Sequence, residues 1–410
     1  MKNRVAVTGV GVVSPIGIGT DDFWKATLAE ESGAGEITLF DASCYAQKIA
    51  AEVKGFNPSD FMLPEVFRKI DRFAQFGVAA AKMAVDDAKL EGLYDQNSNN
   101  IPVIIGSGLG GSLFHEEQIF QLIGNQDPKK VLSSSVPRIT PNAVSAFIAM
   151  LFKFRGLNLS ISTACSSGGN AIGLSAERIE NGKADLVITG GVECPISPFT
   201  YAAYQSLRVL AKGLKGAQKA SRPFDKDRDG FVLGEGAVIL VLENYEKAVL
   251  RKASIYAELK GHASNCGAYH MAAPDPSAED AAAVMKAALA AANLEPQDVD
   301  YINAHGTATK ANDVCEAKAI GLVFGSGDAR PYVSSTKSQI GHTIGAAGAF
   351  GALASILAIK HQTVPPNINC DEIDPECNVK VAKSPVKQKI RNAISNSFGF
   401  GSNNTSLVFG

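Results

Sequence analysis

Short apolar segments, many of them bounded by glycine, recur along the whole chain. They lie at 5–9, 103–108, 186–191, 237–242, 255–259, 299–306, 332–337 and 406–410. Their apolar positions are continuous rather than alternating, which is typical of strands buried on both faces. The pattern therefore predicts β-structure that is covered on both sides.

Helical patterns separate these strands. Between 67 and 84, the small and apolar residues recur at a spacing that forms one face of a helix. The segments 168–181, 278–292 and 346–360 are rich in alanine and are also predicted to be helices. Because strands and helices alternate and no Gly/Ser linker divides the chain, we expect a layered α/β fold.

Two distant segments share one plan: a strand, a turn of small residues, then a helix. The first, 157–179, contains Cys165, and the second, 332–356, contains His342. We interpret this as an internal duplication with a boundary near residue 250. The half 1–250 then carries the cysteine, and the half 251–410 carries His305, His342 and Lys337.

Composition narrows the class of protein. Of the 410 residues, 46% are hydrophobic and 20% charged, so the chain can bury a large core. Lys and Arg number 39 against 41 Asp and Glu, which gives no basic field for nucleic acid or an anionic membrane. The seven cysteines are scattered, no signal-peptide pattern opens the chain, and no uninterrupted apolar run reaches about 18 residues. We expect a cytoplasmic protein without a membrane span.

Cys165 is the first candidate for chemistry. It lies in the sequence STACSSGG, between a predicted strand and a predicted helix. A thiol at a helix N-terminus is near the positive end of the helix dipole, which lowers the thiol pKa. A buried, inert cysteine is the alternative for this position when it is taken alone.

Three more reactive side chains also follow predicted strands. His305 lies in NAHGTAT, and Lys337 and His342 lie in SSTKSQIGHTIG. A single histidine is more often a core residue than a catalytic one. However, α/β folds place reactive groups where strands end, so the four residues together favour a catalytic site.

Other motifs do not support a metal or nucleotide site. The glycine-rich segments 9–17 and 106–111 lack the spacing of nucleotide-binding loops. The segment 225–230 begins like a calcium loop, but Gly236 stands where the bidentate glutamate belongs. Cys370 and Cys377 have no second ligand pair with zinc spacing. We therefore expect no bound metal.

Six motifs in order connect the chain with a known family. They are VTGVGVVSPIG, TACSSG, SRPFDKDRDGFVLGEGA, NAHGTAT, SSTKSQIGHTIGAAGA and NSFGFGSNN. With them the chain resembles the β-ketoacyl-[acyl-carrier-protein] synthases of the thiolase superfamily. The likeness is greatest to the type II elongating synthases and to the ketosynthase-α subunits of type II polyketide systems.

The resemblance implies a fold and a set of site residues. The fold is a five-layered α-β-α-β-α thiolase fold of two duplicated halves, usually dimeric. By this resemblance, Cys165, His305 and His342 match the family's catalytic trio, and Lys337 matches the lysine that supports it. Phe400 matches the gating phenylalanine, which also serves the oxyanion hole. Leu109 and Tyr204 match positions of the acyl tunnel, and Asp313 and Glu316 match acidic residues that help to hold the lysine.

The resemblance also implies the reaction and the partners. Cys165 accepts an acyl chain as a thioester, malonyl-ACP loses carbon dioxide, and the resulting enolate attacks the thioester without a cofactor. The partner is the acidic acyl carrier protein, for which Lys69, Arg72 and Arg208 are candidate contacts. The dimer is either a homodimer or a heterodimer with a chain-length-factor homologue.

Some positions depart from the family pattern. Gly351 occupies the place of a glutamate that usually follows GAAGA, and GFGSNN replaces the GFGGTN of primary-metabolism enzymes. The segment ATKAND at 307–312 also differs from the housekeeping version. These changes favour the ketosynthase subunit of a specialised polyketide pathway, with a housekeeping elongating synthase as the alternative. A degradative thiolase and a non-catalytic chain-length factor are the less favoured readings.

Overall fold

The computed structural model describes residues 2–90, 100–325, 327 and 330–410. Two five-stranded arrays form its centre, one in each half of the chain. They meet where β1 (Val5–Ser14) pairs over two residues with β10 (Ala257–Cys266). The other strands of the first array are β5 (Val103–Gly106), β6 (Asn158–Ile161), β7 (Leu186–Glu193) and β9 (Gly236–Asn244). Those of the second are β11 (Tyr301–Asn303), β12 (Tyr332–Ser334), β15 (Ala393–Gly399) and β16 (Asn403–Phe409).

Both arrays have the same topology. The first runs β6-β5-β7-β9-β1 and the second β12-β11-β15-β16-β10. When the strands of each half are counted in chain order, both arrays read 3-2-4-5-1. In each, the first three strands are parallel and the last two antiparallel. This repetition confirms the two duplicated halves, while the boundary near residue 250 remains a proposal.

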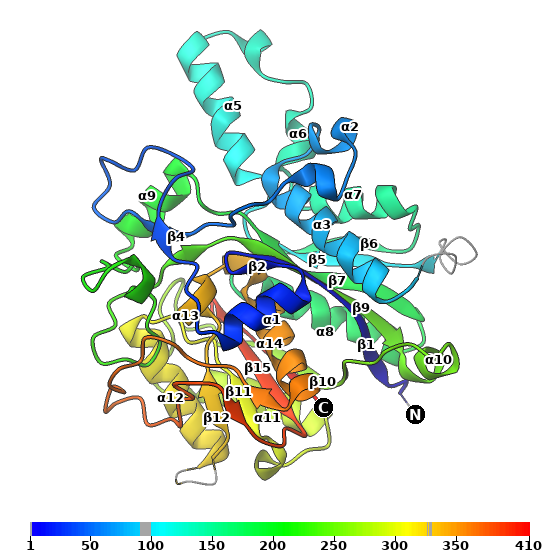
Figure 1. Cartoon of the computed structure of the whole chain (residues 1–410), viewed down its shortest axis with the longest axis vertical. Helices are drawn as coiled ribbons and strands as arrows, with labels where there is room; N and C mark the ends of the chain where they lie inside the picture. The colour runs from blue at the N-terminus through cyan, green and yellow to red at the C-terminus, as the bar shows by residue number, and fades with distance from the viewer. Residues whose placement is uncertain (1, 91–99, 326, 328–329) are drawn as a thin grey trace.

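Helices separate the arrays and cover their outer faces (Figure 1). Between the arrays lie α8 (Ser167–Glu180) and α14 (Ala347–His361), which contact each other and strands of both halves. Outside the first array pack α3 (Arg72–Asp87) and α7 (Ala143–Phe152), and outside the second lie α11 (Glu279–Ala291) and α12 (Lys310–Phe324). The five layers match the expected thiolase-like fold.

Shorter elements complete the described chain. Among the described residues, the remaining α-helices are α1 (Thr20–Leu28), α2 (Pro64–Phe67), α5 (Ser112–Asn125), α6 (Ser135–Ile139), α9 (Pro198–Ser206), α10 (Tyr245–Leu250) and α13 (Lys337–Ile340). The remaining strands are β2 (Gly17–Ile18), β3 (Gly35–Glu36), β4 (Ile49–Ala51), β8 (Leu233–Gly234), β13 (Thr363–Val364) and β14 (Val386–Lys387).

The predicted helix over 67–84 was wrong at its start. The chain forms α2, which ends at Phe67, and then begins α3 at Arg72 with Asp71 as its N-cap, whose carboxylate accepts from the Arg72 N–H at 2.6 Å. Side chains of α2 and α3 pack in the same apolar cluster. Their apolar periodicity therefore continues across a break in the backbone.

The apolar helix α14 belongs to the core. The stretch Ile344–His361 is long and apolar enough to cross a membrane, but 83% of it is buried inside the structure. It packs against α8 and against strands of both arrays. Its apolarity is explained by this position between two sheets.

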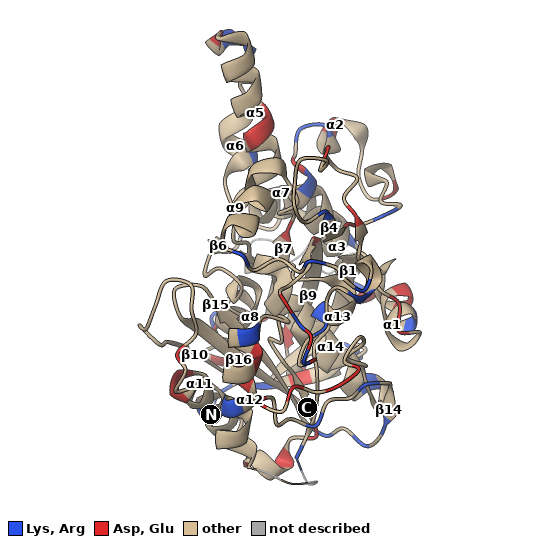
Figure 2. Ribbon diagram, turned by 90° about the vertical axis from the view of Figure 1, so that its left-hand side faces the viewer, with Lys and Arg blue, Asp and Glu red and all other residues tan. Residues whose placement is uncertain are grey.

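The α5–α6 arm projects from the body of the molecule (Figure 1). Figure 2 shows one acidic segment on α5 and no other charge along the rest of this helix. Ile119, Phe120, Ile123, Leu132 and Val136 are each more than two-fifths exposed on this arm and the loop that follows α5. An apolar surface of this kind is typical of a contact between subunits.

Gly106 lets the end of β5 approach the start of α8. A Cβ at this position would lie 2.3 Å from the carbonyl carbon of Ser167 and 2.4 Å from the Gly168 nitrogen, both backbone atoms. The first turn of α8 therefore rests directly on the strand.

Gly106→Ala should lower the free energy of unfolding by about 3 kcal/mol or more, because backbone atoms must move to admit the methyl group. Denaturant unfolding measures it. The matched control is Gly321→Ala in α12, where a Cβ meets nothing within 4 Å and helix propensity adds up to about 1 kcal/mol. Equal stability of the two variants would contradict this packing.

Candidate active site

Cys165 lies in a tight turn between β6 and α8. Ala164, the residue before it, has a φ of +52°, which is uncommon for a residue with a side chain. The Ser167 hydroxyl holds the turn by donating to the Ala164 carbonyl at 2.6 Å and accepting from the Thr163 N–H at 2.9 Å. The turn places a buried thiol just before the N-terminus of α8.

His342 reaches the thiol from the second half of the chain. Its Nε2 lies 3.2 Å from Cys165 Sγ, and its backbone N–H donates to the Val232 carbonyl at 2.7 Å. The Ile344 N–H donates to His342 Nδ1 at 3.3 Å. Because Nδ1 accepts, the proton of the neutral ring belongs on Nε2. His342 therefore presents an N–H to the sulfur.

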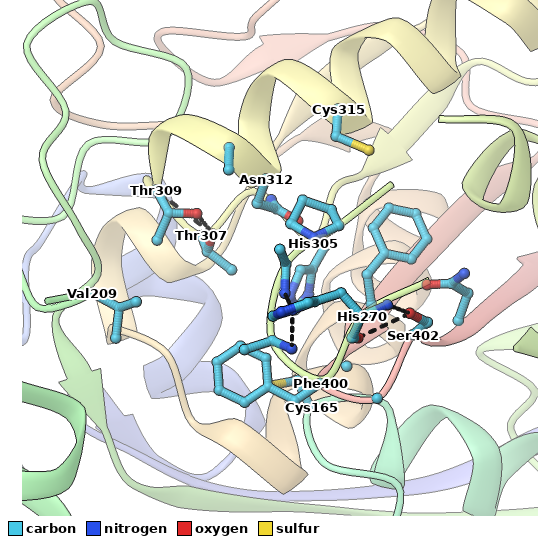
Figure 3. A pocket seen from close by; sticks show the side chains of 18 of the residues that line it. Cys165, Val209, His270, His305, Thr307, Thr309, Asn312, Cys315, Phe400 and Ser402 are labelled. Carbon is cyan, nitrogen blue, oxygen red and sulfur yellow. Dashed lines mark hydrogen bonds between the residues drawn. The ribbon is translucent and has the colours of Figure 1, made fainter. Parts of the chain in front are cut away.

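His305 completes the trio (Figure 3). Its ring centroid lies 5.4 Å from that of His342, at an angle of 84°, and donor atoms of Cys165, His305 and His342 all lie within 4.8 Å of one another. His305 Nδ1 is buried without a partner among the described residues. Cysteine and histidine are also the ligand types of zinc. Within the described residues, this trio is the one group of three such side chains whose ligand atoms converge.

Glu316 and Asp313, which lie on α12, hold the backbone around the trio. Glu316 accepts from the N–H groups of His305 at 2.8 Å and Gly306 at 2.7 Å. Asp313 accepts from the Phe224 N–H at 2.8 Å and forms an ion pair with Arg228 at 3.4 Å. Neither carboxylate forms an ion pair with Lys337 within the described residues, so any support for Lys337 acts through the electrostatic field.

Lys337 is buried and controls the electrostatics of the site. Burial lowers its own pKa and raises that of Glu316. Burial lowers the pKa values of His305 and His342 well below the usual range, and the charge of Lys337 lowers both further. Both imidazoles are therefore neutral at pH 7, and each carries one N–H.

The thiol pKa differs from the sequence prediction. Burial raises the pKa of Cys165 to about 11, although the charge of Lys337 and the backbone N–H groups of Phe400 and Cys165 lower it. Desolvation outweighs the favourable position at the helix terminus. Backbone N–H groups of Phe400 and Cys165 therefore lie close to the sulfur, and backbone N–H groups are the kind of donor from which an oxyanion hole is built.

A cavity of about 230 Å³ opens over the trio. Phe400, Tyr204, Val209 and Phe231 are among the residues that line it. Leu109 is not: it is 37% exposed, and its N–H donates to Glu193. The tunnel position predicted for Leu109 is therefore not part of the cavity wall in this single chain.

The sequence did not single out other residues of the cavity wall. Cys315 and His270 line it, and the N–H groups of Ala272 and Ala273 donate to His270 Nδ1 at 3.0 Å each. Ser402 has a φ of +59° and donates to the His270 carbonyl at 3.3 Å. This serine, one of the departures in GFGSNN, therefore fastens the Phe400 loop to the His270 loop.

Glu193 was also missed, although it connects three segments of the site. Its buried carboxylate accepts from the Ser107 hydroxyl at 3.0 Å and from the N–H groups of Gly108 at 2.6 Å, Leu109 at 3.1 Å and Gly345 at 3.0 Å. Burial raises its pKa to about 7 against these donors. The carboxylate joins the segment after β5 to the segment that carries His342.

Gly351 leaves no room for a larger side chain without movement. A Cβ would lie 2.5 Å from Ser395 Oγ and 2.8 Å from Asn303 Oδ1. Asn303 in turn donates to the Tyr301 hydroxyl at 2.9 Å. A buried polar cluster thus occupies the space beside the position where the resembling family has its glutamate.

The three candidate cations for a carrier protein have different environments. Lys69 and Arg208 are exposed. Arg72 is not a surface cation, because its guanidinium pairs with buried Glu235 at 2.6 Å and also donates to the Val53 carbonyl. Arg72 is therefore a structural residue.

Comparison with known proteins agrees with this geometry. The family described as "Beta-ketoacyl synthase, N-terminal domain" matches residues 2–248, and "Beta-ketoacyl synthase, C-terminal domain" matches 256–371. The chain belongs to the β-ketoacyl synthase family. It is thus an acyltransferase of the condensing class.

Relatives and solved structures cover the whole chain. The protein named 3-oxoacyl-[acyl-carrier-protein] synthase 2 of Synechocystis is 42% identical, covering 100% of this chain and 98% of its own length. Its namesake in Coxiella burnetii is 43% identical, covering 99% and 98%. The structure "The ishigamide ketosynthase/chain length factor" matches with a TM-score of 0.92 and 36% identity, covering 100% and 99%. A β-ketoacyl synthase from Burkholderia phymatum matches with a TM-score of 0.92 and 32% identity, again covering 100% and 99%.

Lys337→Met should slow alkylation of Cys165 by iodoacetamide about threefold to tenfold at pH 7.5. Removing the positive charge raises the thiol pKa further and reduces the reactive thiolate fraction. The rate is measured by mass spectrometry of the Cys165 peptide. Lys183→Met is the control: this exposed lysine lies after the C-terminal end of α8, and its loss should leave the rate unchanged. An unchanged rate in Lys337→Met would show that its charge does not reach the thiol.

Glu193→Gln should reduce both thermal stability and condensation rate. The amide places an N–H₂ group against backbone donors, which leaves buried groups unpaired at about 1–3 kcal/mol each. Thermal unfolding and kcat/KM are the measurements. Exposed Glu376→Gln serves as the control. Wild-type values for both quantities in Glu193→Gln would refute the linking role of this carboxylate.

Proposed function

We propose that the chain catalyses the decarboxylative Claisen condensation of malonyl-ACP with an acyl chain held on Cys165. The observation that carries this proposal is the buried trio: one thiol and two neutral imidazoles within 4.8 Å, at the base of a largely apolar cavity. A thiol can hold the acyl chain, and two N–H donors can stabilise an enolate. The family match supports the same chemistry.

In the first half-reaction, Cys165 attacks the carbonyl carbon of an acyl-ACP thioester. The carbonyl oxygen becomes an oxyanion and accepts from the N–H groups of Cys165 and Phe400. The intermediate collapses, the carrier's pantetheine leaves as a thiolate and takes up the proton that the Cys165 thiol gave up, and the acyl chain remains on Cys165. His342 Nε2–H and the charge of Lys337 stabilise the attacking thiolate, which compensates for its burial.

In the second half-reaction, malonyl-ACP loses carbon dioxide and becomes an enolate. The N–H groups of His305 and His342 both donate to the enolate oxygen, each contributing about 2–4 kcal/mol by analogy with single oxyanion donors. The enolate carbon then attacks the carbonyl carbon of the Cys165 thioester, the bond from this carbon to the Cys165 sulfur breaks, and the thiolate of Cys165 leaves as β-ketoacyl-ACP is released. Since departure of carbon dioxide drives this step, we propose that no cofactor is needed.

Two pathways use this chemistry, and they differ in the partner subunit. We assign the chain to the ketosynthase subunit of a type II polyketide system. Gly351, Ser402 and the likeness to the ishigamide ketosynthase/chain length factor support this assignment. The identity of 42–43% with the synthases 2 of Synechocystis and Coxiella burnetii favours the alternative, a homodimeric fatty acid elongating synthase.

In either pathway, a second subunit covers the exposed apolar arm of α5 and α6. We propose that the carrier protein delivers both substrates, because the solved complex of a type II PKS acyl-carrier protein with its ketosynthase matches this chain with a TM-score of 0.90 at 30% identity. A cytoplasmic location remains a prediction.

The test is to mix the purified chain with malonyl-ACP and a medium-chain acyl-ACP and to read the carrier-bound products by intact mass. Extension only in the presence of a co-expressed chain-length-factor homologue supports the polyketide assignment, whereas extension by the chain alone supports the homodimeric alternative. Cys165→Ala should abolish extension under both conditions, because no acyl thioester can form. Undiminished extension by Cys165→Ala would refute the proposed function itself.

A further inference from the structure

Glu116 carries a buried carboxylate that takes no part in the proposed reaction. The residue lies on α5 and is buried in the described structure. Its carboxylate accepts from the Ser197 hydroxyl, from the Phe199 N–H at 2.9 Å and from the Thr200 hydroxyl at 3.2 Å. These donors stand 81 to 84 residues further along the chain, so the contact joins two segments that are far apart in sequence.

Glu116 caps the N-terminus of α9 from outside that helix. Ser197 is the N-cap residue, but its side chain forms no capping bond to α9, and its hydroxyl donates to Glu116 instead. A carboxylate at a helix N-terminus satisfies N–H groups that have no partner inside the helix, and the positive end of the helix dipole stabilises its charge. The start of α9 is therefore coupled to α5.

α9 leads into the wall of the cavity above Cys165. Tyr204, in the second half of this helix, lines the cavity, and so does Val209, which follows the helix. The Tyr204 ring packs edge-on against Phe231, with ring centroids 5.6 Å apart. Phe231 packs in the same way against His342, at 5.0 Å. The position of α9 therefore sets the position of an aromatic wall that reaches the catalytic trio.

Other contacts anchor the middle and the end of α9 to the segment 46–49. The Tyr201 hydroxyl donates to the Ile49 carbonyl at 2.9 Å, and the side-chain oxygen of Gln205 accepts from the Ala46 N–H at 2.9 Å. These bonds do not involve Glu116. Loss of the Glu116 contacts therefore releases the start of α9 while its end stays attached, which changes the tilt of the helix.

We infer that Glu116 is a positioning residue for acyl-chain binding: by capping α9 it fixes Tyr204 in the cavity wall. The inference rests on the proposed function and adds a residue that acts on the binding of the acyl chain rather than on bond making. Glu116 is not among the residues that line the cavity. A long acyl chain gains its binding energy from many close contacts with the wall, so a displaced Tyr204 ring weakens its binding and leaves the chemistry at Cys165 intact.

The test compares Glu116→Gln with the matched control Glu117→Gln. The amide keeps the size of the side chain, but removes its charge and places an N–H₂ group against the donors of α9. Glu117 is the next residue of α5 and is exposed. Ser197→Ala, which removes one donor to the carboxylate, is the milder variant should Glu116→Gln lose stability. Each protein, with any partner subunit that its activity requires, is assayed for kcat and KM with dodecanoyl-ACP and for alkylation of Cys165 by iodoacetamide.

The expected result is a KM for dodecanoyl-ACP raised about threefold to tenfold in Glu116→Gln and about twofold in Ser197→Ala, with kcat close to wild type. Because iodoacetamide carries no acyl chain, its rate of reaction with Cys165 should not change. Glu117→Gln should match wild type in every assay. In a Tyr204→Ala background, Glu116→Gln should raise the KM no further, because the side chain that it positions is gone.

An unchanged KM in both Glu116→Gln and Ser197→Ala would overturn the inference. Fully additive effects of Glu116→Gln and Tyr204→Ala would also overturn it, since Glu116 would then act by another route. The same holds for an equal loss in the alkylation rate, which would mean that the whole site is disturbed.

Failure of the proposed function gives a different result. An unreactive dodecanoyl amide of pantetheine is used as the probe, and its binding is measured by calorimetry. Wild type that binds this amide more tightly than Glu116→Gln does, but is never acylated on Cys165 by dodecanoyl-ACP, would refute the condensation reaction and leave the positioning role standing.

Discussion

The contact between Cys165 Sγ and His342 Nε2, 3.2 Å long and buried, is the interaction on which the rest of the structure depends. Its two atoms belong to different halves of the chain. The duplicated arrays bring Cys165, which lies just before α8, to the segment after α13, which carries the imidazole. The shared central layer of α8 and α14 fixes this approach, and Gly106 and Glu193 fix the segments on either side of it.

Burial sets the chemistry of this contact. It keeps both histidines neutral, so that they act as N–H donors, and it also raises the pKa of the thiol to about 11. The charge of Lys337 opposes the second effect and reinforces the first. The buried charge of Lys337 therefore keeps the thiol reactive in a cavity from which water is excluded. In the proposed reaction, the backbone N–H donors and the two imidazoles stabilise the negative charge that develops on the substrate.

Much of this could be predicted from the sequence because strand, helix and motif signals are local. The continuous apolar strands, the four reactive residues and the layered fold all followed from short segments. Glu193 could not be found, because its partners at 107–109 and 345 become neighbours only after folding. The pairing of Arg72 with Glu235 and the break before α3 depend on tertiary contacts in the same way. The direction of the Cys165 pKa shift was missed because sequence shows the helix terminus but not the depth of burial.

The most direct test of the account is to find where the acyl group goes. The protein is incubated with acyl-ACP alone, digested, and its peptides are examined by mass spectrometry, before and after malonyl-ACP is added. The account predicts one acyl group, on the Cys165 peptide, that disappears when malonyl-ACP arrives and reappears in β-ketoacyl-ACP. An acyl group on another residue, such as Cys315, or an adduct on Cys165 that malonyl-ACP does not discharge, would contradict the central claim.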